Sequence, residues 1–143
     1  MVIYIETYRK NKLYFRSDHL VYKCCNHVIF CPKYRKGILI GDVALRLKEI
    51  CLEVAEQHDF KIEEIETDKN HIHMIINCNP RYGIMKCIQI IKSISAFKLY
   101  KEFPYIKKRY LWGGQFWSRS NFVSTVGSVS LENVKQYIEN QGK

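Results

Sequence analysis

The spacing of hydrophobic residues divides the first half of the chain into a strand and a helix. Residues 20–31 are rich in β-branched and aromatic side chains and stop at Pro32, a pattern that predicts a strand. Residues 42–58 repeat apolar side chains every three or four positions, which predicts a helix. Its expected inward face consists of Val43, Leu47, Ile50 and Val54, widened by Leu45 and Leu52.

The middle of the chain predicts two strands and a second helix. Residues 61–67 alternate polar and apolar positions and predict a half-buried strand, and a tight turn at 68–70 leads into a strand over 71–78. Apolar residues then recur at helical spacing over 83–103. The expected inward positions of this helix are Ile84, Cys87, Ile88, Ile91, Ile94 and Phe97.

The remaining elements complete a recognisable order. Residues 112–126 are strand-like, and Ser130 is placed to cap a last helix over 130–141. The order strand, helix, strand, strand, helix, strand, helix is that of the βαββαβ unit. We therefore expect an α+β, ferredoxin-like (RRM-like) fold, with an antiparallel sheet, two helices on one of its faces and an added C-terminal helix. A single domain would span residues 1–143, with a polar N-terminal arm at 1–18 and a core at 20–127.

The net positive charge of the chain indicates what kind of partner it binds. The 23 Lys and Arg residues against 14 Asp and Glu leave a formal net charge of +9, which favours a polyanion. Nucleic acid is the first candidate and an anionic membrane surface the second, while a basic protein that merely stays soluble is the plain alternative. Because the sequence contains no apolar run of roughly 18 residues and no signal-peptide pattern, we expect no membrane span and a cytoplasmic, nucleoid-associated protein. Its six cysteines form no C-x-x-C pair and are expected to be free and reduced.

Two histidines in the predicted strand at 71–78 are candidate metal ligands. In a strand, residues two apart point to the same face, so His71 and His73 would project together. Two neutral imidazoles side by side can share one divalent metal ion. Taken in isolation, an H-x-H pair is more often two ordinary strand histidines, and a metal site needs further ligands.

The last predicted helix carries a candidate nucleophile. Tyr137 and Gln141 are four residues apart and would lie on one face of the helix. A phenol oxygen can attack phosphorus, but it is mostly protonated at neutral pH and needs assistance, which a nearby metal could provide. The glutamine carbonyl could complete the coordination of that metal. The alternative reading is an aromatic residue at the core boundary beside a solvated glutamine.

Basic residues gather at a predicted turn over 33–37 and at a predicted loop over 107–109, and they are interleaved with aromatic side chains. Phosphate contacts from lysine and arginine, together with stacking on exposed rings, are the usual means of holding nucleic acid. The lysines of the helix over 83–103 fit a solvated surface nearly as well. The candidate DNA contacts are Lys33, Arg35, Lys36, Lys107, Lys108, Arg109 and Arg119.

Four segments together resemble one family. Residues 30–36 (FCPKYRK), 67–74 (TDKNHIHM), 110–127 (YLWGGQFWSRSNFVSTVG) and 134–141 (VKQYIENQ) resemble, in the same order, segments of small single-tyrosine HUH transposases. These enzymes belong to bacterial and archaeal insertion sequences that move as single-stranded DNA. The resemblance runs from about Tyr22 to the end of the sequence, and the arm at 1–18 has no counterpart in it.

The resemblance implies a role for each candidate residue. His71, His73 and Gln141 would bind Mg²⁺ or Mn²⁺, and Tyr137 would form a 5′-phosphotyrosine link and free a 3′-hydroxyl. The protein would be a homodimer with composite active sites, binding single-stranded DNA hairpins near the ends of its element. Where the family often has aspartate before the first histidine, this chain has Asn70, which would support the ligand without adding charge.

Two other functions remain open at this point. A domesticated relative that cuts hairpins without moving an element would share the same catalytic residues. A non-catalytic ferredoxin-like nucleic-acid binder would instead stack bases on sheet aromatics and would need neither the paired histidines nor the tyrosine helix. A structural metal-binding protein is disfavoured, because the cysteines lack ligand spacing.

Overall fold

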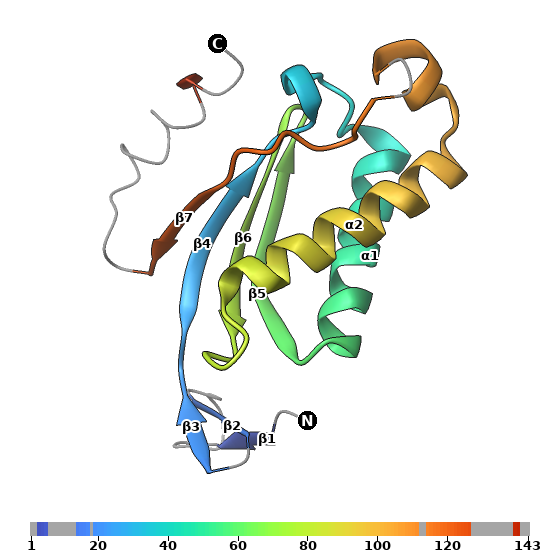
Figure 1. Ribbon diagram of the computed structural model, residues 1–143. Helices are drawn as coiled ribbons and strands as arrows, with labels where there is room; N and C mark the ends of the chain where they lie inside the picture. Colours follow the sequence, from blue (N-terminus) through green and yellow to red (C-terminus); the bar gives the residue numbers. More distant parts are fainter. Residues whose placement is uncertain (1–2, 6–13, 18, 112–113, 127–138, 141–143) are drawn as a thin grey trace.

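From β4 (Cys25–Phe30) to β7 (Phe122–Thr125) the fold follows the expected order of elements, while the helix predicted over 130–141 lies outside the described residues except for 139–140. The computed structural model of the protein describes residues 3–5, 14–17, 19–111, 114–126 and 139–140 (Figure 1). Its elements are β1 (Ile3–Ile5), β2 (Tyr14–Ser17), β3 (Leu20–Tyr22), β4 (Cys25–Phe30), the 3₁₀ turn η1 (Lys33–Arg35), α1 (Gly41–Gln57), β5 (Phe60–Asp68), β6 (His71–Cys78), α2 (Ile84–Glu102), the π-helical turn η2 (Lys107–Leu111) and β7 (Phe122–Thr125).

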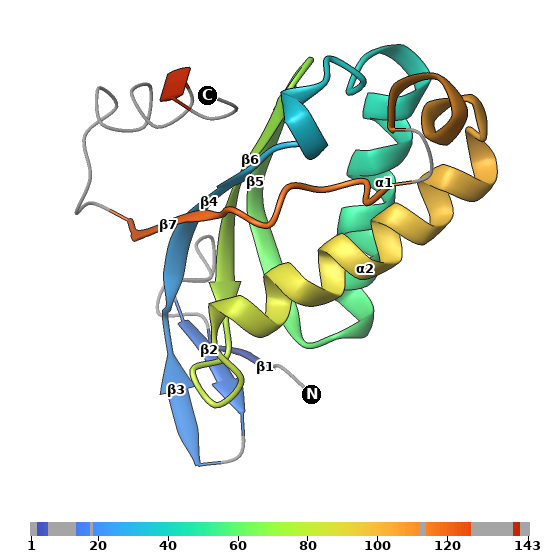
Figure 2. The ribbon, with the colours of Figure 1, turned by 45° about the horizontal axis from the view of Figure 1, so that its top comes forward.

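The main sheet has the topology of a ferredoxin-like fold. Its strand order is β5-β6-β4-β7, and every neighbouring pair is antiparallel. The two β-α-β connections carry α1 and α2 to the same face of the sheet, as Figures 1 and 2 show. The expected α+β class, sheet type and placement of two helices on one face are confirmed.

The alternation of side chains along β6 separates the core from the open face of the sheet. Ile72, Met74 and Ile76 are fully buried and belong to the apolar core between the sheet and the helices. His71 and His73 take the intervening positions, so they lie on the opposite face and are only half-buried. Burying the first set therefore determines where the histidines point.

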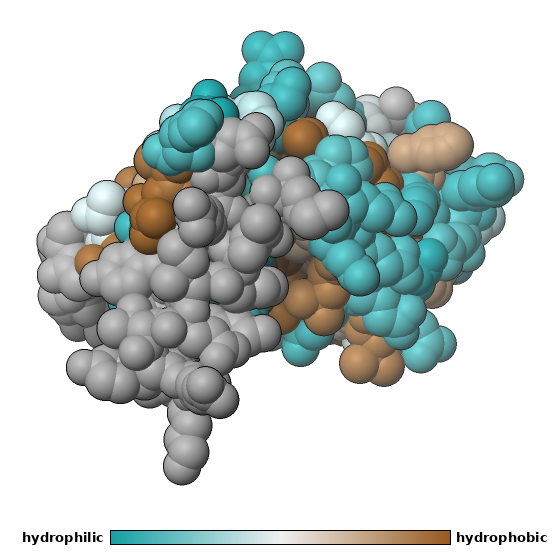
Figure 3. All heavy atoms as spheres, turned by 90° about the horizontal axis from the view of Figure 1, so that it is seen from below, coloured by the Kyte–Doolittle hydropathy of each residue, from teal (hydrophilic) through white to brown (hydrophobic). Residues whose placement is uncertain are grey.

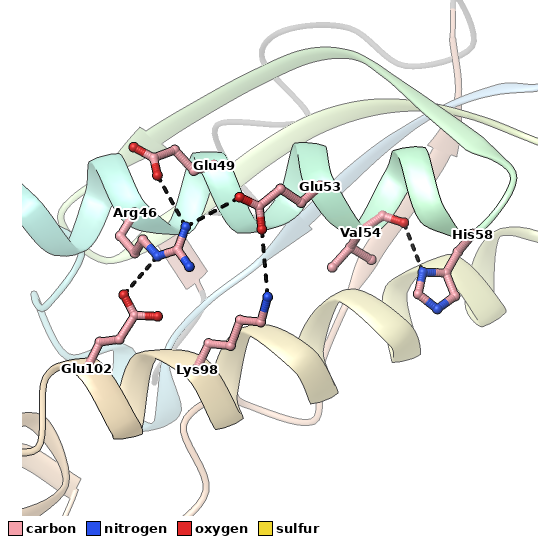
Figure 4. A network of polar contacts seen from close by, with 7 residues as sticks. All are labelled: Arg46, Glu49, Glu53, Val54, His58, Lys98 and Glu102. Atoms are coloured by element: carbon pink, nitrogen blue, oxygen red, sulfur yellow. Dashed lines mark hydrogen bonds and ion pairs between the residues drawn. The ribbon is translucent and has the colours of Figure 1, made fainter.

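The two helices are also joined by exposed ion pairs. The guanidinium of Arg46 on α1 lies 2.8 Å from a carboxylate oxygen of Glu102 on α2, and Lys98 of α2 lies 3.6 Å from Glu53 of α1 (Figure 4). At the end of α1, His58 donates from Nδ1 to the Val54 carbonyl at 2.9 Å. Exposed ion pairs contribute little to stability, so the buried layer carries most of the packing energy.

The structure corrects the predicted inward faces of both helices. Leu45 and Leu52 are 61% and 49% exposed, so the buried face of α1 is narrower than expected. Phe97 on α2 is 62% exposed. Ser95 takes a buried position on α2 instead, and its hydroxyl accepts a hydrogen bond from Trp117 Nε1 at 2.9 Å. The indole of Trp117 therefore contacts α2 at Ser95, at a polar position that periodicity alone did not assign to the interior.

Several predicted boundaries also change. Part of the region expected to be an N-terminal arm forms strands, because β1, β2 and β3 make a separate three-stranded antiparallel sheet. The single strand predicted over 20–31 is divided into β3 and β4. The strand predicted over 112–126 reduces to β7 and an isolated bridge between Pro32 and Trp117. The 107–109 segment, expected to be a loop, is part of η2.

Polar side chains dominate the described surface in Figure 3, with apolar side chains in small groups among them. Such scattered apolar residues are normal for a protein surface. Within the part of the chain that the structure describes, no helix is long and apolar enough to cross a bilayer.

Two leucines of α1 test this account of the core. Leu47 is fully buried and Leu45 is 61% exposed. We expect Leu47→Ala to lower the free energy of unfolding by about 2–5 kcal/mol, through lost burial and the cavity left behind. Leu45→Ala makes the same change on the same helix and should alter the free energy of unfolding by less than about 0.5 kcal/mol. Urea unfolding followed by circular dichroism measures both, and equal losses would contradict the assignment of the buried face.

Candidate functional site

His71 is held in a defined orientation at the start of β6. Its Nδ1 lies 3.0 Å from the side-chain oxygen of Asn70. Because an amide oxygen only accepts hydrogen bonds, Nδ1 of His71 must carry the proton in this contact. The lone pair of Nε2 is then available to a ligand. Asn70 thus contacts His71, and its role in supporting a metal ligand stays a prediction.

Burial favours the neutral form of both histidines. It lowers the pKa of His71, and the positive charge of Arg35 acts in the same direction while Asp68 opposes it. Burial also lowers the pKa of His73, assisted by the neighbouring His27 and opposed by Glu66 and Glu64. A neutral imidazole is the form that binds a metal ion. The pair is thus suited to bind a metal ion at neutral pH.

Sequence reasoning missed His27, which lies against His73. His27 is on β4, opposite Ile75 of β6, on the open face of the sheet. Its Nδ1 is 3.1 Å from Nε2 of His73, and the two rings are nearly parallel, with centroids 5.3 Å apart and planes at 14°. The two residues are 46 positions apart in the sequence. Only the strand register could have revealed the contact.

Carboxylates border the histidines on the neighbouring strand β5. Glu66 pairs with His73 across the sheet and Asp68 pairs with His71. Even so, the described residues contain no group of three or more His, Cys, Asp or Glu side chains arranged to hold a metal ion. The donor set fits a divalent cation that takes two imidazole nitrogens from the sheet and its remaining ligands from elsewhere.

Tyr137 and Gln141 lie outside the described residues, but Glu139 between them is described. Arg35 Nη1 donates to the backbone carbonyl of Glu139 at 3.0 Å. Arg35 is also close enough to His71 to influence its pKa. This contact places Glu139 of the same chain beside the turn η1.

The first predicted DNA-binding cluster occupies a strained turn. Tyr34 and Arg35 in η1 have φ angles of 59° and 52°, the left-handed region that such residues seldom adopt. The backbone N–H of Lys33 anchors the turn by donating to the Phe116 carbonyl at 2.8 Å. Tyr34 is 70% exposed, and the ammonium of Lys33 lies 5.6 Å from the centre of its ring. The turn offers both charge and an aromatic surface, with Lys36 exposed directly after it.

The second cluster and Arg119 are also exposed. Lys107, Lys108 and Arg109 lie in η2, and Figure 1 shows η1 and η2 at the same end of the molecule, where β5 passes into β6. Arg119 borders a groove of about 840 Å³ between α2 and the segment 115–121. The two basic clusters therefore lie on turns at the same end of the molecule, and Arg119 lies at the groove beside α2.

The helix lysines do not behave alike. Lys92 is half-buried in the groove, where its ammonium donates to the Ser118 carbonyl at 2.7 Å. Burial lowers its pKa to about 8. Lys98 is paired with Glu53, whereas Lys86 and Lys101 are exposed. Lys86 and Lys101 fit the interpretation of these lysines as a solvated surface, while Lys92 holds the segment that leads to Arg119.

The family described as "Transposase IS200 like" matches residues 20–141, which is most of the chain. The chain belongs to this family. The predicted resemblance to single-tyrosine transposases of single-stranded-DNA insertion sequences is thereby confirmed. The match begins at Leu20, so β1 and β2 lie before it.

Two curated transposases and two solved structures are similar to this IS200-like transposase. The ISDra2 transposase TnpA of Deinococcus radiodurans is 32% identical over 121 residues, covering 85% of this chain and 86% of the relative. The IS200 transposase of Salmonella typhimurium is 29% identical over 123 residues, covering 86% and 80%. A crystal structure of a candidate transposase from D. radiodurans R1 superposes with a TM-score of 0.79 at 32% identity, covering 88% of this chain and 96% of that one. A REP-associated tyrosine transposase bound to a REP hairpin shares the fold, with a TM-score of 0.51 at 12% identity, covering 87% and 69%.

Asn70 provides a test of the histidine site. Asn70→Ala removes the acceptor for His71 Nδ1–H and should weaken Mn²⁺ binding about 10-fold, the lower end of the usual effect of such partners. Asn70→Asp keeps an acceptor and adds a negative charge, so it should bind Mn²⁺ more tightly than the wild type. Isothermal titration with Mn²⁺ compares the three proteins. Equal affinities would show that Asn70 does not support a metal ligand.

Proposed function

We propose that this IS200-like transposase cleaves and rejoins single-stranded DNA at the ends of its element, with Tyr137 as nucleophile and with His71 and His73 as ligands of Mg²⁺ or Mn²⁺. One observation carries the proposal. Two half-buried imidazoles, both favoured in the neutral form, project from one face of β6, with Nδ1 of His71 engaged by Asn70. A non-catalytic nucleic-acid binder has no need of this arrangement.

The proposed reaction exchanges one phosphate ester for another. The phenol oxygen of Tyr137 attacks the phosphorus, a P–O bond to tyrosine forms, and the bond from phosphorus to the 3′-oxygen breaks. The phenol proton leaves and the released 3′-oxygen takes up a proton, which yields a 5′-phosphotyrosine and a free 3′-hydroxyl. Attack by a 3′-hydroxyl on the phosphotyrosine reverses the steps and joins DNA without a nucleotide cofactor. A divalent cation, when bound, would polarise the scissile phosphate.

The contact between Arg35 and Glu139 supports the participation of Tyr137. Glu139 lies two residues after Tyr137 and two before Gln141, and its carbonyl is bound by the residue that also acts on the pKa of His71. We infer that the C-terminal segment brings Tyr137 to the histidines and that Gln141 adds a third ligand. A homodimer with composite active sites is part of the same proposal. Because Arg35 binds Glu139 of its own chain, a cis arrangement is also accessible.

The substrate that we propose is a single-stranded DNA hairpin. A protein of the same fold, a REP-associated tyrosine transposase, has been solved bound to a REP hairpin. The net charge of +9 and the exposed residues of η1 and η2 suit a phosphate backbone. Lys33, Lys36, Lys107, Lys108, Arg109 and Arg119 would hold the hairpin stem, and Arg35 would divide its donors between DNA and the C-terminal segment. A domesticated relative that only cuts hairpins would use the same residues.

A covalent adduct tests Tyr137 as the nucleophile. Wild-type protein incubated with Mg²⁺ and single-stranded DNA bearing an element-end hairpin should give a protein–DNA species that survives a denaturing gel. Tyr137→Phe lacks the attacking oxygen and should give none. Tyr82→Phe, at an exposed tyrosine in the loop before α2, is the matched control and should retain the adduct. An adduct with Tyr137→Phe would remove this residue from the mechanism.

Separating binding from cleavage tests His71. We expect His71→Ala to reduce cleavage at least 100-fold while hairpin affinity changes less than about threefold, because the basic turns are untouched. His58→Ala, at the C-terminal end of α1, serves as the control and should leave both unchanged. Gel shifts and cleavage assays on the same DNA provide the two readouts. Parallel loss of binding and cleavage in His71→Ala would indicate a structural histidine.

A further inference from the structure

His27 touches the candidate site but has no part in the chemistry described above. It projects from β4 onto the open face of the sheet, and its Nδ1 lies 3.1 Å from Nε2 of His73. The nearly parallel rings, at 14° to one another, place these nitrogens at hydrogen-bonding distance. Both residues are half-buried, so the contact is partly protected from water.

The position of one proton decides what this contact does. Two neutral imidazoles can form a hydrogen bond only if one ring donates N–H and the other offers a lone pair. If His27 donated, the lone pair of His73 Nε2 would be occupied and His73 Nδ1 would carry the remaining proton. Neither nitrogen of His73 could then bind a cation. If His73 donates from Nε2, its Nδ1 lone pair is available.

Only the second arrangement is compatible with His73 as a metal ligand while the contact persists. We propose that His27 is a positioning residue that accepts the Nε2–H of His73, sets the tautomer and ring orientation of His73, and leaves its Nδ1 free for the cation. This inference rests on the proposed function, in which His73 is a ligand. It assigns a role to a residue of β4 that the cleavage mechanism does not use.

His71 has a similar hydrogen bond from one ring nitrogen, but its partner is Asn70. Asn70 accepts the Nδ1–H of His71 and leaves Nε2 available. Each proposed ligand thus has one nitrogen engaged by a neutral acceptor and the other free, but the free nitrogens differ: Nε2 on His71 and Nδ1 on His73. Such partners commonly change metal affinity 10–100-fold when they are removed.

The surroundings of His73 distinguish a positioning role from the alternatives. Glu66 and Glu64 influence the pKa of His73 from β5, but the ring contact is with His27. The described residues contain no cluster of three metal-binding side chains that would include His27 as a ligand. A role limited to ring stacking would be preserved by any flat aromatic ring, which makes the hydrogen bond separable by mutation.

Two substitutions at one position separate the hydrogen bond from the stacking. His27→Phe keeps a flat ring and removes the acceptor. His27→Asn removes the ring but places an amide oxygen near the original Nδ1, so it can still accept the proton. We expect His27→Phe to weaken Mn²⁺ binding about 10–100-fold and His27→Asn to stay within about threefold of the wild type. Isothermal titration of each full-length protein with Mn²⁺ gives the affinities, and His73→Ala defines complete loss of this ligand.

A second measurement detects the position of the proton directly. In the metal-free wild type, ¹⁵N NMR of the imidazole rings should show His73 protonated at Nε2, and His27→Phe should alter this tautomer. A wild-type His73 protonated at Nδ1 would overturn the proposal. So would an unchanged Mn²⁺ affinity in His27→Phe, a folded His27→Asn as weak as His27→Phe, or a loss in His27→Phe as complete as in His73→Ala, which would make His27 a ligand itself.

The adduct assay on the same preparations keeps the two proposals apart. Wild-type protein that binds Mn²⁺ but forms no covalent DNA link would contradict the tyrosine mechanism and leave the His27 result standing. Wild-type protein that forms the link while His27→Phe binds Mn²⁺ normally would support the mechanism and overturn the role of His27.

Discussion

The antiparallel pairing of β6 with its two neighbours is the constraint on which the rest of this structure depends. Because side chains alternate along a strand, burying Ile72, Met74 and Ile76 beneath the helices forces His71 and His73 onto the open face. A slip of one residue would exchange the two sets and bury both imidazoles in the apolar layer. The same strand register therefore sets both the packing of the core and the orientation of the candidate ligands.

The same pairing supplies the electrostatic environment of the histidines. The register brings His27 from β4 and Glu66 from β5 to either side of His73, and Asn70 engages His71 from the adjoining turn. Partial burial lowers the pKa of both ligand candidates, while the carboxylates of β5 oppose this effect. The balance favours neutral rings whose proton positions are decided by their neighbours, a suitable starting state for binding a cation.

Around this site, the turns at one end of the sheet combine positive charge with anchoring contacts. In the η1 turn, the backbone N–H of Lys33 donates to the Phe116 carbonyl, and the side chain of Arg35 donates to the Glu139 carbonyl. Lys92 holds the segment before Arg119 by binding the Ser118 carbonyl. These contacts link the proposed DNA-binding turn η1 with Phe116 and Glu139, and they fix the segment that leads to Arg119.

The sequence by itself determined the order of the elements from β4 to β7, the buried face at Val43, Leu47, Ile50 and Val54, and the shared direction of His71 and His73, because all of these follow from local periodicity. The motifs also determined the family. Only the tertiary structure decided that Ser95 rather than Phe97 faces the interior, that part of residues 1–18 pairs as a sheet, and that His27 meets His73. The first and the last of these depend on residues far apart in the chain, 22 positions for Ser95 and Trp117 and 46 for the two histidines, and the local spacing of residues does not reveal such contacts. The N-terminal strands pair with near neighbours in the sequence, but their weak alternation of polar and apolar residues did not predict them.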